Sequence, residues 1–228
     1  REDPPLPLPR LRALGQVTEI RQHDLCFNTQ ETREFLQEIM GLTVAEESVS
    51  ALEQRTEGWI TGLQLAGLSM QGQRDIDGFV RQFTGSNRFV LDYLMEEVFA
   101  GQCEEVIEFL LWTSHLERLC GTLCDYILKR SDSQERLEYL EQMNLFTFPL
   151  DQSRNWYRYH RLFGELLRTR SYARSPSDVV EIHKRAYQWY RSAGLTEDAI
   201  HHAFAAHDLD AAAELVVEIN SSLLKRGE

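Results

Sequence analysis

The chain has 228 residues, and its 24 basic and 36 acidic side chains give a formal net charge of −12. This length allows one large domain or two to three small ones. Hydrophobic residues make up 43% of the chain, which excludes wholesale disorder. The negative charge argues against direct binding of nucleic acid, because most of the surface would repel phosphates.

Membrane insertion, secretion and independent catalysis are also disfavoured. No stretch approaches the roughly 20 apolar residues of a membrane span, and four cysteines do not make a disulfide framework. We therefore expect a cytoplasmic protein without membrane contact. The chain holds three lysines, and none follows a glycine-rich loop. No phosphate-binding P-loop is present, so we expect no enzymatic activity of this chain alone.

The first residues are rich in proline. Pro4, Pro5, Pro7 and Pro9 predict an extended, polyproline-like connector within residues 1–22. A chain that opens in this way is expected to be a fragment of a longer protein.

Residues 23–100 are predicted to form a helical domain, because their apolar side chains recur at a spacing of three to four. A capping box of Thr43 and Glu46 is expected to start one of the helices, which continues through Leu63. The other predicted helices cover residues 29–40, 75–84 and 87–100.

Two glycines interrupt the helical pattern around Trp59. Gly58 and Gly62 each cost about 1 kcal/mol relative to alanine inside a helix. They indicate a helix junction or a place where another group approaches the backbone closely. We give equal weight to two explanations of these glycines: close packing of one helix on another, and close approach of a ligand.

Residues 101–172 are predicted to form a winged helix. Three short helices, at about 104–113, 116–129 and 133–143, precede two β-rich runs around a polar turn. The third helix carries Glu135, Glu138 and Glu141, which would repel DNA phosphates. A protein-binding or regulatory role is therefore favoured over DNA recognition.

Residues 173–228 are predicted to begin an array of antiparallel helical repeats. Ser175 caps a helix that Gly194 ends, Thr196 caps the next, and Asp208 begins a third. The expected fold class is mainly α: a helical bundle, then a winged helix with a small β-hairpin, then helical-repeat helices.

Two clusters invite a metal-site interpretation, and both have a plainer alternative. Cys120 and Cys124, with His115 nearby, are favoured as packing residues, because no second ligand pair follows at a usual distance. His201, His202 and His207 are favoured as solvated or capping residues, because adjacent histidines point to different helix faces.

The stretch 151–191 is locally basic, with nine Arg or Lys side chains against four Asp or Glu. One hypothesis is an anion site, in which Arg158 and His160 emerge from the hairpin toward a nucleotide phosphate. The alternative, equally weighted, is a solvated face that pairs with the acidic helices.

The segment Thr56–Ala66 resembles a motif of the large MalT-like transcriptional activators, which belong to the STAND class of signal-transduction ATPases and end in a LuxR-type helix-turn-helix. The resemblance recurs in order along nearly the whole chain, at Arg1–Leu8, Phe109–Ser114, Asn144–Phe146, Trp156–Phe163, Ala186–Tyr190 and Gly194–Leu195.

This resemblance implies an architecture and a function. A P-loop nucleotide-binding domain would precede residue 1, and tetratricopeptide-like repeats that sense an inducer would continue to a DNA-binding helix-turn-helix. In such proteins ADP holds the resting state, whereas ATP and inducer favour an open, self-associating form. The implied cofactors are ATP and ADP, and the implied partners are the missing domains and an unknown inducer or regulatory protein. A stand-alone helical scaffold that binds a protein partner is the alternative.

The resemblance also assigns residues. Arg1 matches an arginine that ends the nucleotide-binding domain and is a candidate phosphate sensor. Gly58, Trp59 and Ile60 match a segment near the adenine, although Ile60 replaces the proline that is common there. His160 takes the place of a winged-helix histidine that contacts the ADP phosphate.

Overall fold

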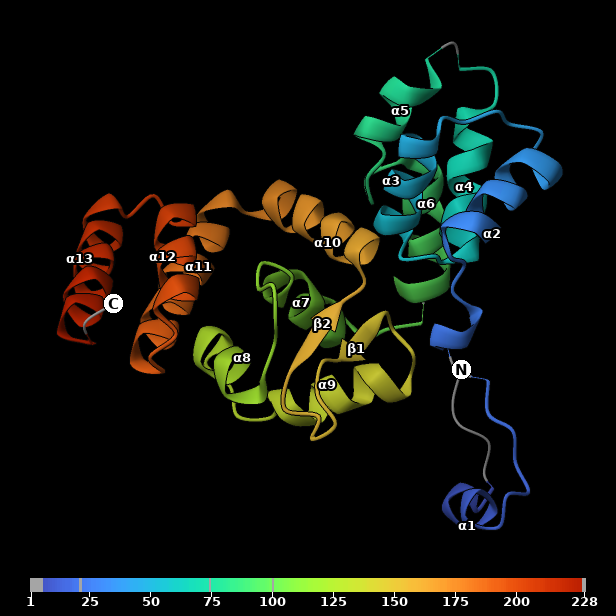
Figure 1. Ribbon diagram of the computed structural model, residues 1–228. Helices are drawn as coiled ribbons and strands as arrows, with labels where there is room; N and C mark the ends of the chain where they lie inside the picture. Colours follow the sequence, from blue (N-terminus) through green and yellow to red (C-terminus); the bar gives the residue numbers. More distant parts are fainter. Residues whose placement is uncertain (1–5, 21, 74, 100, 227–228) are drawn as a thin grey trace. The chain divides into compact units, whose positions relative to one another are not determined.

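The computed structural model describes residues 6–20, 22–73, 75–99 and 101–226 (Figure 1). Internal contacts divide the chain into two compact units, each assembled from separated stretches. Unit 1 holds Arg1–Gly101, Gln142–Asn144 and His160–Leu166, and unit 2 holds Gln102–Glu141, Leu145–Tyr159 and Leu167–Glu228. The boundaries expected after residues 22, 100 and 172 stay predictions.

The helices of unit 1 form a small bundle whose apolar sides pack together. The bundle consists of α2 (Thr29–Glu34), α3 (Glu46–Thr56), α4 (Ile60–Met70), α5 (Ile76–Gln82) and α6 (Arg88–Leu94), with π-helical turns at Phe35–Ile39 and Met95–Phe99. It is preceded by α1 (Leu8–Ala13), which buries no residue, and by a 3₁₀ turn at Gln22–Leu25. Leu52, Leu63 and Leu94 are fully buried between the helices of the bundle.

Three expectations for this region are wrong. The proline-rich start is not extended throughout, because Leu8–Ala13 is helical and Pro9 lies at its first turn, where proline is tolerated. The helix expected through Leu63 is two helices, because Glu57 and Gly58 have φ of 51° and 68°, outside the helical region. Thr43 does not cap the first of them, whose N-cap is Ala45 without a side-chain bond.

The first part of unit 2 has the predicted succession of helices and a hairpin. Helices α7 (Glu104–Thr113), α8 (Gly121–Leu128) and α9 (Ser133–Gln142) precede strands β1 (Thr147–Pro149) and β2 (Tyr157–Tyr159). The strands pair antiparallel, with Phe148 opposite Arg158. Helix α8 starts five residues later than the predicted 116, because Leu119 is in extended backbone and forms a β-bridge with Tyr157.

Four further helices complete the chain. Helix α10 (Arg161–Arg174) contributes its first six residues to unit 1 and the rest to unit 2, and α11 (Pro176–Ser192), α12 (Thr196–Ala205) and α13 (Leu209–Arg226) follow in unit 2. Ser175 caps α11 as predicted, accepting a hydrogen bond from the Asp178 amide at 3.4 Å. The expected mainly-α class with a small β-hairpin is confirmed. In the described part of the chain, no helix is both long and apolar enough to cross a bilayer.

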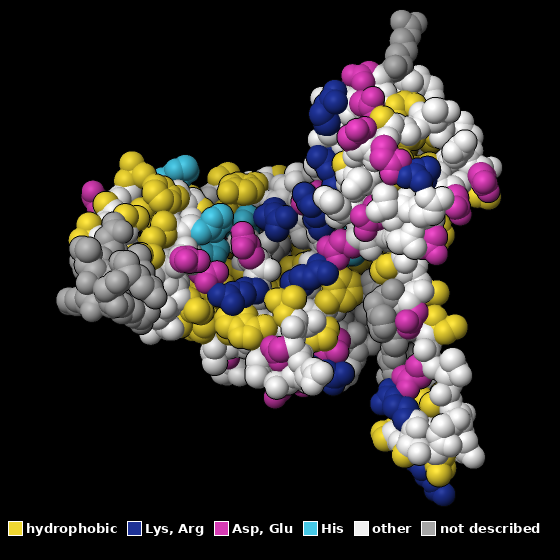
Figure 2. All heavy atoms as spheres, in the orientation of Figure 1, with side chains coloured by type: hydrophobic (Ala, Val, Ile, Leu, Met, Phe, Trp, Pro, Cys, Tyr) yellow, Lys and Arg dark blue, Asp and Glu magenta, His cyan; other side chains and the backbone are white. Residues whose placement is uncertain are grey.

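A group of buried histidines lies inside unit 2. Figure 2 shows further histidine side chains at the surface over α11 and α12. His183 Nδ1 lies 2.8 Å from His202 Nδ1, and the rings of His115 and His183 are 5.3 Å apart. His115 Nε2 lies 2.6 Å from the hydroxyl of Ser171 in α10. The three rings therefore connect the end of α7 with three of the later helices.

The prediction that the C-terminal histidines are solvated or capping is wrong for one of them. His202 is 2% exposed, and its ring stacks on Tyr190 at 5.3 Å with an interplanar angle of 8°. Its position on the inner side of α12, against α11, is a tertiary contact that spacing alone does not reveal. His201 and His207 are exposed.

Candidate functional site

The junction between α3 and α4 brings together most of the residues to which the resemblance assigned a role. Glu57 ends α3 in the left-handed region, Gly58 continues it with φ of 68°, and Trp59 is the N-cap of α4. The Gly58 carbonyl accepts a hydrogen bond from the Phe27 amide at 2.8 Å. A Cβ on Gly58 would lie 2.3 Å from the Phe27 carbonyl oxygen. The close approach indicated by the glycine is therefore made by the protein's own backbone.

His160 is anchored at this junction. Its Nε2 lies 3.0 Å from the carbonyl oxygen of Thr56, the last residue of α3. A carbonyl only accepts, so Nε2 carries the proton and donates a hydrogen bond to this oxygen, which also accepts from the Trp59 amide at 2.9 Å. The ring meets Trp59 edge to face at 5.7 Å, and Trp59 meets Tyr93 at 5.6 Å. His160 is only 1% exposed in this arrangement.

Arg161, which follows His160, begins α10 and binds Glu57, which follows Thr56. The Arg161 amide donates to Glu57 Oε1 at 2.9 Å. The first amides of a helix have no intrahelical partner and attract anions. A carboxylate thus stands beside His160 at a helix start, where a phosphate oxygen would be bound by the same donors. These donors are of the kind that a phosphate needs, but in this structure Thr56 and Glu57 hold both of them.

Sequence reasoning missed the roles of Thr56, Glu57 and Arg161. All three fall within the segments that carry the resemblance, but nothing in their local pattern marks a contact. Each bond joins residues that are 104 positions apart in the chain, so no helical or strand spacing could reveal it.

Ile60 also belongs to the junction, because it is the first residue of α4 and directly follows Trp59. The two predicted arginines do not. Arg158 belongs to unit 2, where its guanidinium lies 5.3 Å from the Phe148 ring and donates to the Tyr159 carbonyl at 3.3 Å. Arg1 lies outside the described residues.

The basic stretch 151–191 is largely engaged in ion pairs. Its arginines pair with acidic side chains in both units: Arg154 with Glu141, Arg161 with Glu165, Arg174 with Glu108, Arg185 with Glu181, and Arg191 with Glu214 and Glu218. These pairs favour the alternative of a face that pairs with acidic helices over a convergent cluster of arginines.

The cysteines predicted to be packing residues lie in the core of unit 2. Cys124 is fully buried, and burial raises the pKa of its thiol well above the usual value. His115 is engaged with Ser171. Among the described residues, no group of three His, Cys, Asp or Glu side chains is arranged to hold a metal ion.

Comparison with known proteins identifies part of the chain and relates the rest to larger proteins. Residues 95–179 match the family described as the MalT winged helix domain. The chain is 33% identical over 218 residues to the serine/threonine-protein kinase PknK of Mycobacterium tuberculosis, covering 96% of this chain and 20% of the kinase. It is also 33% identical over 230 residues to the HTH-type transcriptional regulator MalT of Vibrio campbellii, covering 100% and 26%. It is 34% identical over 210 residues to MalT of Klebsiella pneumoniae, and this match covers 91% of this chain and 23% of that protein. The chain thus spans between a fifth and about a quarter of these relatives.

Proposed function

Because this chain is a MalT-like regulatory segment with a MalT winged helix domain, we propose that it forms the middle of a longer, nucleotide-switched transcriptional activator. In this proposal a preceding STAND-class nucleotide-binding domain supplies the P-loop. Helices α11–α13 begin a tetratricopeptide-like array that senses an inducer, and a LuxR-type helix-turn-helix beyond it binds DNA. The activated protein self-associates in the cytoplasm, and its ATP hydrolysis is slow and serves as the switch.

The names of the relatives support a control module. The same segment matches a protein named as a transcriptional regulator and one named as a protein kinase, at 33% identity in both. A segment found both in a transcriptional regulator and in a protein kinase is better explained by a regulatory role than by DNA binding or kinase activity. The acidic third helix of the winged helix agrees, because it would repel DNA.

The observation that carries the nucleotide proposal is the position of His160 at the end of α3, beside Trp59 and the start of α10. We propose that His160 and the first amide of α10 hold the ADP phosphate, with Gly58, Trp59 and Ile60 near the adenine. Arg158 and Arg1 are the further proposed contacts. Bound ADP would supply negative charge that holds these elements in the resting arrangement.

The His160→Ala variant of the parent protein tests this proposal. We expect its ADP affinity to fall about tenfold, because a hydrogen bond to a charged group is worth roughly 1.5–3 kcal/mol. Basal transcription should rise, because the resting state is held less firmly. Isothermal titration with ADP and a reporter assay without inducer measure the two effects.

The exposed His201 provides a matched control. His201→Ala should change neither ADP affinity nor basal transcription. Unchanged ADP affinity and unchanged basal transcription in His160→Ala would contradict the proposed role of His160.

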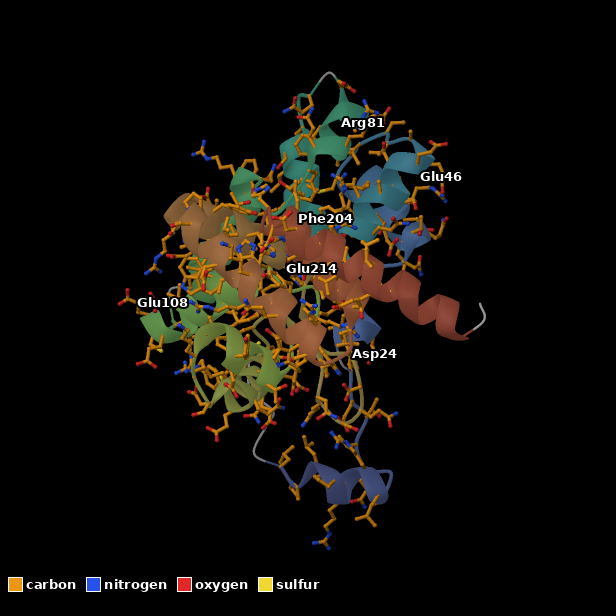
Figure 3. The ribbon with its side chains drawn as sticks, turned by 90° about the vertical axis from the view of Figure 1, so that its left-hand side faces the viewer. Asp24, Glu46, Arg81, Glu108, Phe204 and Glu214 are labelled. Carbon is orange, nitrogen blue, oxygen red and sulfur yellow. The ribbon has the colours of Figure 1, made fainter. Side chains whose placement is uncertain are left out.

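A stand-alone scaffold for a protein partner is the second candidate. The observation that favours it is an exposed apolar surface on α12 and α13, where Phe204 is 54%, Leu209 66% and Val217 62% exposed. Figure 3 shows Phe204 and Glu214 on the side of these helices that faces the viewer. The coding sequence on both sides distinguishes the two functions: a P-loop before this segment and a helix-turn-helix after it support the activator.

A further inference from the structure

We propose that unit 2 carries a ligand site of its own: a cavity between α8, α9, the hairpin turn and α11 that binds a guanidinium group beside two carboxylates and two indole rings. The ligand class is a guanidinium on a short hydrocarbon chain, which is found in free small molecules and in the arginine side chains of polypeptides. The site goes beyond the proposed function and does not rest on it, because none of its residues is among those proposed to hold the nucleotide.

The cavity lies wholly within unit 2 and has a volume of about 690 Å³. Sites for small molecules commonly have volumes of about 300–1,000 Å³. Four of the lining side chains carry the argument: Asp125 of α8, Glu138 of α9, Trp156 directly before β2, and Trp189 of α11. All four are half-buried. The cavity is therefore partly screened from water and still open to a ligand.

The two carboxylates of the cavity have no cationic partner. Asp125 Oδ1 accepts a hydrogen bond from the Ser133 amide at 3.0 Å. Glu138 Oε1 accepts one from the side-chain amide of Gln134 at 2.9 Å. Within the part of the chain that the structure describes, neither carboxylate is paired with a Lys or Arg side chain. Partial burial weakens the solvation of a carboxylate, so these two charges favour a cation bound close by.

Three arginines lie close in sequence to the residues that line the cavity, but other carboxylates hold them. The ion pairs are Arg118 with Asp198, Arg130 with Asp132, and Arg154 with Glu141. These guanidinium groups are thus engaged elsewhere, and the negative charge of the cavity is left for a group from outside the chain.

The two indole rings favour a guanidinium over an ammonium group. The rings of Trp156 and Trp189 meet edge to face, with centroids 6.4 Å apart. The Arg118 guanidinium lies 4.8 Å from the centroid of the Trp156 ring, so this ring already makes a contact of the proposed kind. A guanidinium is planar and weakly hydrated, and it can stack on an indole while its N–H groups donate to a carboxylate. An ammonium group is compact and strongly hydrated, so it suits indole rings less well.

The plainer explanation is a groove between packed elements whose carboxylates are solvated and bind no ligand. Isothermal titration of the parent protein with butylguanidinium distinguishes the two explanations. The control ligand is butylurea, which has nearly the same shape and no charge. We expect butylguanidinium to bind about tenfold more tightly than butylurea, because only the cation can pair with the carboxylates. Absence of butylguanidinium binding, or equal affinities for the two compounds, would overturn the proposal.

Substitutions locate the binding. In Glu138→Gln and Asp125→Asn the side chain keeps a carbonyl oxygen that accepts the present hydrogen bond, but it loses the charge. We expect each to weaken butylguanidinium binding about tenfold, and Trp189→Leu to weaken it about fivefold. Glu138 holds no backbone amide, so Glu138→Gln carries the test if Asp125→Asn disturbs the start of α9. Unchanged affinity in both Glu138→Gln and Trp189→Leu contradicts the site.

Glu135→Gln is the matched control, because Glu135 is an exposed residue of α9 that does not line the cavity. It should leave butylguanidinium affinity unchanged, and a loss equal to that of Glu138→Gln would overturn the proposal by making the effect one of net charge. The blocked amino acid N-acetyl-arginine methylamide distinguishes the two sources of the guanidinium. Tighter binding than butylguanidinium supports an arginine of a polypeptide, and weaker binding supports a free small molecule.

Discussion

Replacing Gly58 by alanine is expected to lower the free energy of unfolding of unit 1 by about 3 kcal/mol. A left-handed backbone costs an alanine roughly 1–2 kcal/mol, and forcing an extra methyl group into packed surroundings costs about 1–3 kcal/mol more. At Gly58 both apply, because φ is 68° and the new Cβ would lie 2.3 Å from the Phe27 oxygen and 2.8 Å from its nitrogen. Backbone atoms that are hydrogen-bonded to Gly58 cannot move away without losing that bond. Urea denaturation of the variant measures the loss.

The chain contains matched controls for this prediction. Gly15 and Gly72 have similar φ values, 63° and 79°, and a Cβ on either meets no atom within 4 Å. Gly72→Ala and Gly15→Ala should therefore cost only about 1 kcal/mol each, from the backbone conformation alone. Equal losses in Gly58→Ala and Gly72→Ala would contradict the role assigned to the Phe27 contact.

Lowering the pH from 7 to 5 is expected to destabilise unit 2 by roughly 6 kcal/mol, chiefly through three buried histidines. Burial lowers the pKa of His115 to about 4, with smaller effects of His183 and Arg168. Burial likewise lowers the pKa of His183 to about 4, with His201 and His207 nearby. The pKa of His202 falls to about 3, through burial and then the three neighbouring histidines His183, His201 and His115.

The direction follows from proton uptake in the two states. Below pH 6.5 the unfolded chain protonates these histidines, whereas the folded unit keeps them neutral until the pH nears 4. The unfolded state therefore binds more protons, and stability is lost as the pH falls through this window. Each histidine contributes roughly 2 kcal/mol between pH 7 and 5. His183 and His202 are in direct contact, so the contributions of these two histidines depend on each other.

Urea denaturation at pH 7 and pH 5, followed by the amide NMR signals of α11 and α12, measures this loss. His202→Gln should reduce the difference between the two pH values, because one group that takes up a proton on unfolding is removed. The exposed His201→Gln should leave the difference nearly unchanged. A pH dependence of the same size in His202→Gln would show that other groups cause it.

Regular local patterns made much of the fold predictable. The hairpin follows from two β-rich runs around a polar turn, and β1 and β2 pair there. Helices α7 and α9 fall within two residues of their predicted ends, because their apolar periodicity is undisturbed. Cap chemistry was reliable at Ser175 and unreliable at Thr43 and Thr196, because the N-caps found there are Ala45 and Leu195, which form no side-chain cap hydrogen bond.

The candidate site was only partly predictable. The resemblance led to His160 and Trp59, whose rings do meet, but local spacing contained no sign of Glu57. Its contact with Arg161 closes a loop of 104 residues and depends on a left-handed residue at the end of α3. His202 was misjudged for the same reason, since its partner His183 lies on another helix. Such contacts arise from tertiary packing, which a single sequence does not display.

The assembly of unit 1 from separated stretches limits how this protein can be cut. A recombinant polypeptide that stops at Gly101 would lack His160–Leu166, although these residues belong to the same compact unit. It would lose the hydrogen bond from His160 to Thr56 at the end of α3. It would also uncover Gly85, which packs against Leu162 so closely that a Cβ would lie 1.9 Å from the Leu162 carbonyl oxygen. It would also lack Phe163, whose ring lies 6.2 Å from the ring of Phe99. Sequence order and folding unit therefore do not coincide here, and a gene fragment that respects the unit must extend through the start of α10.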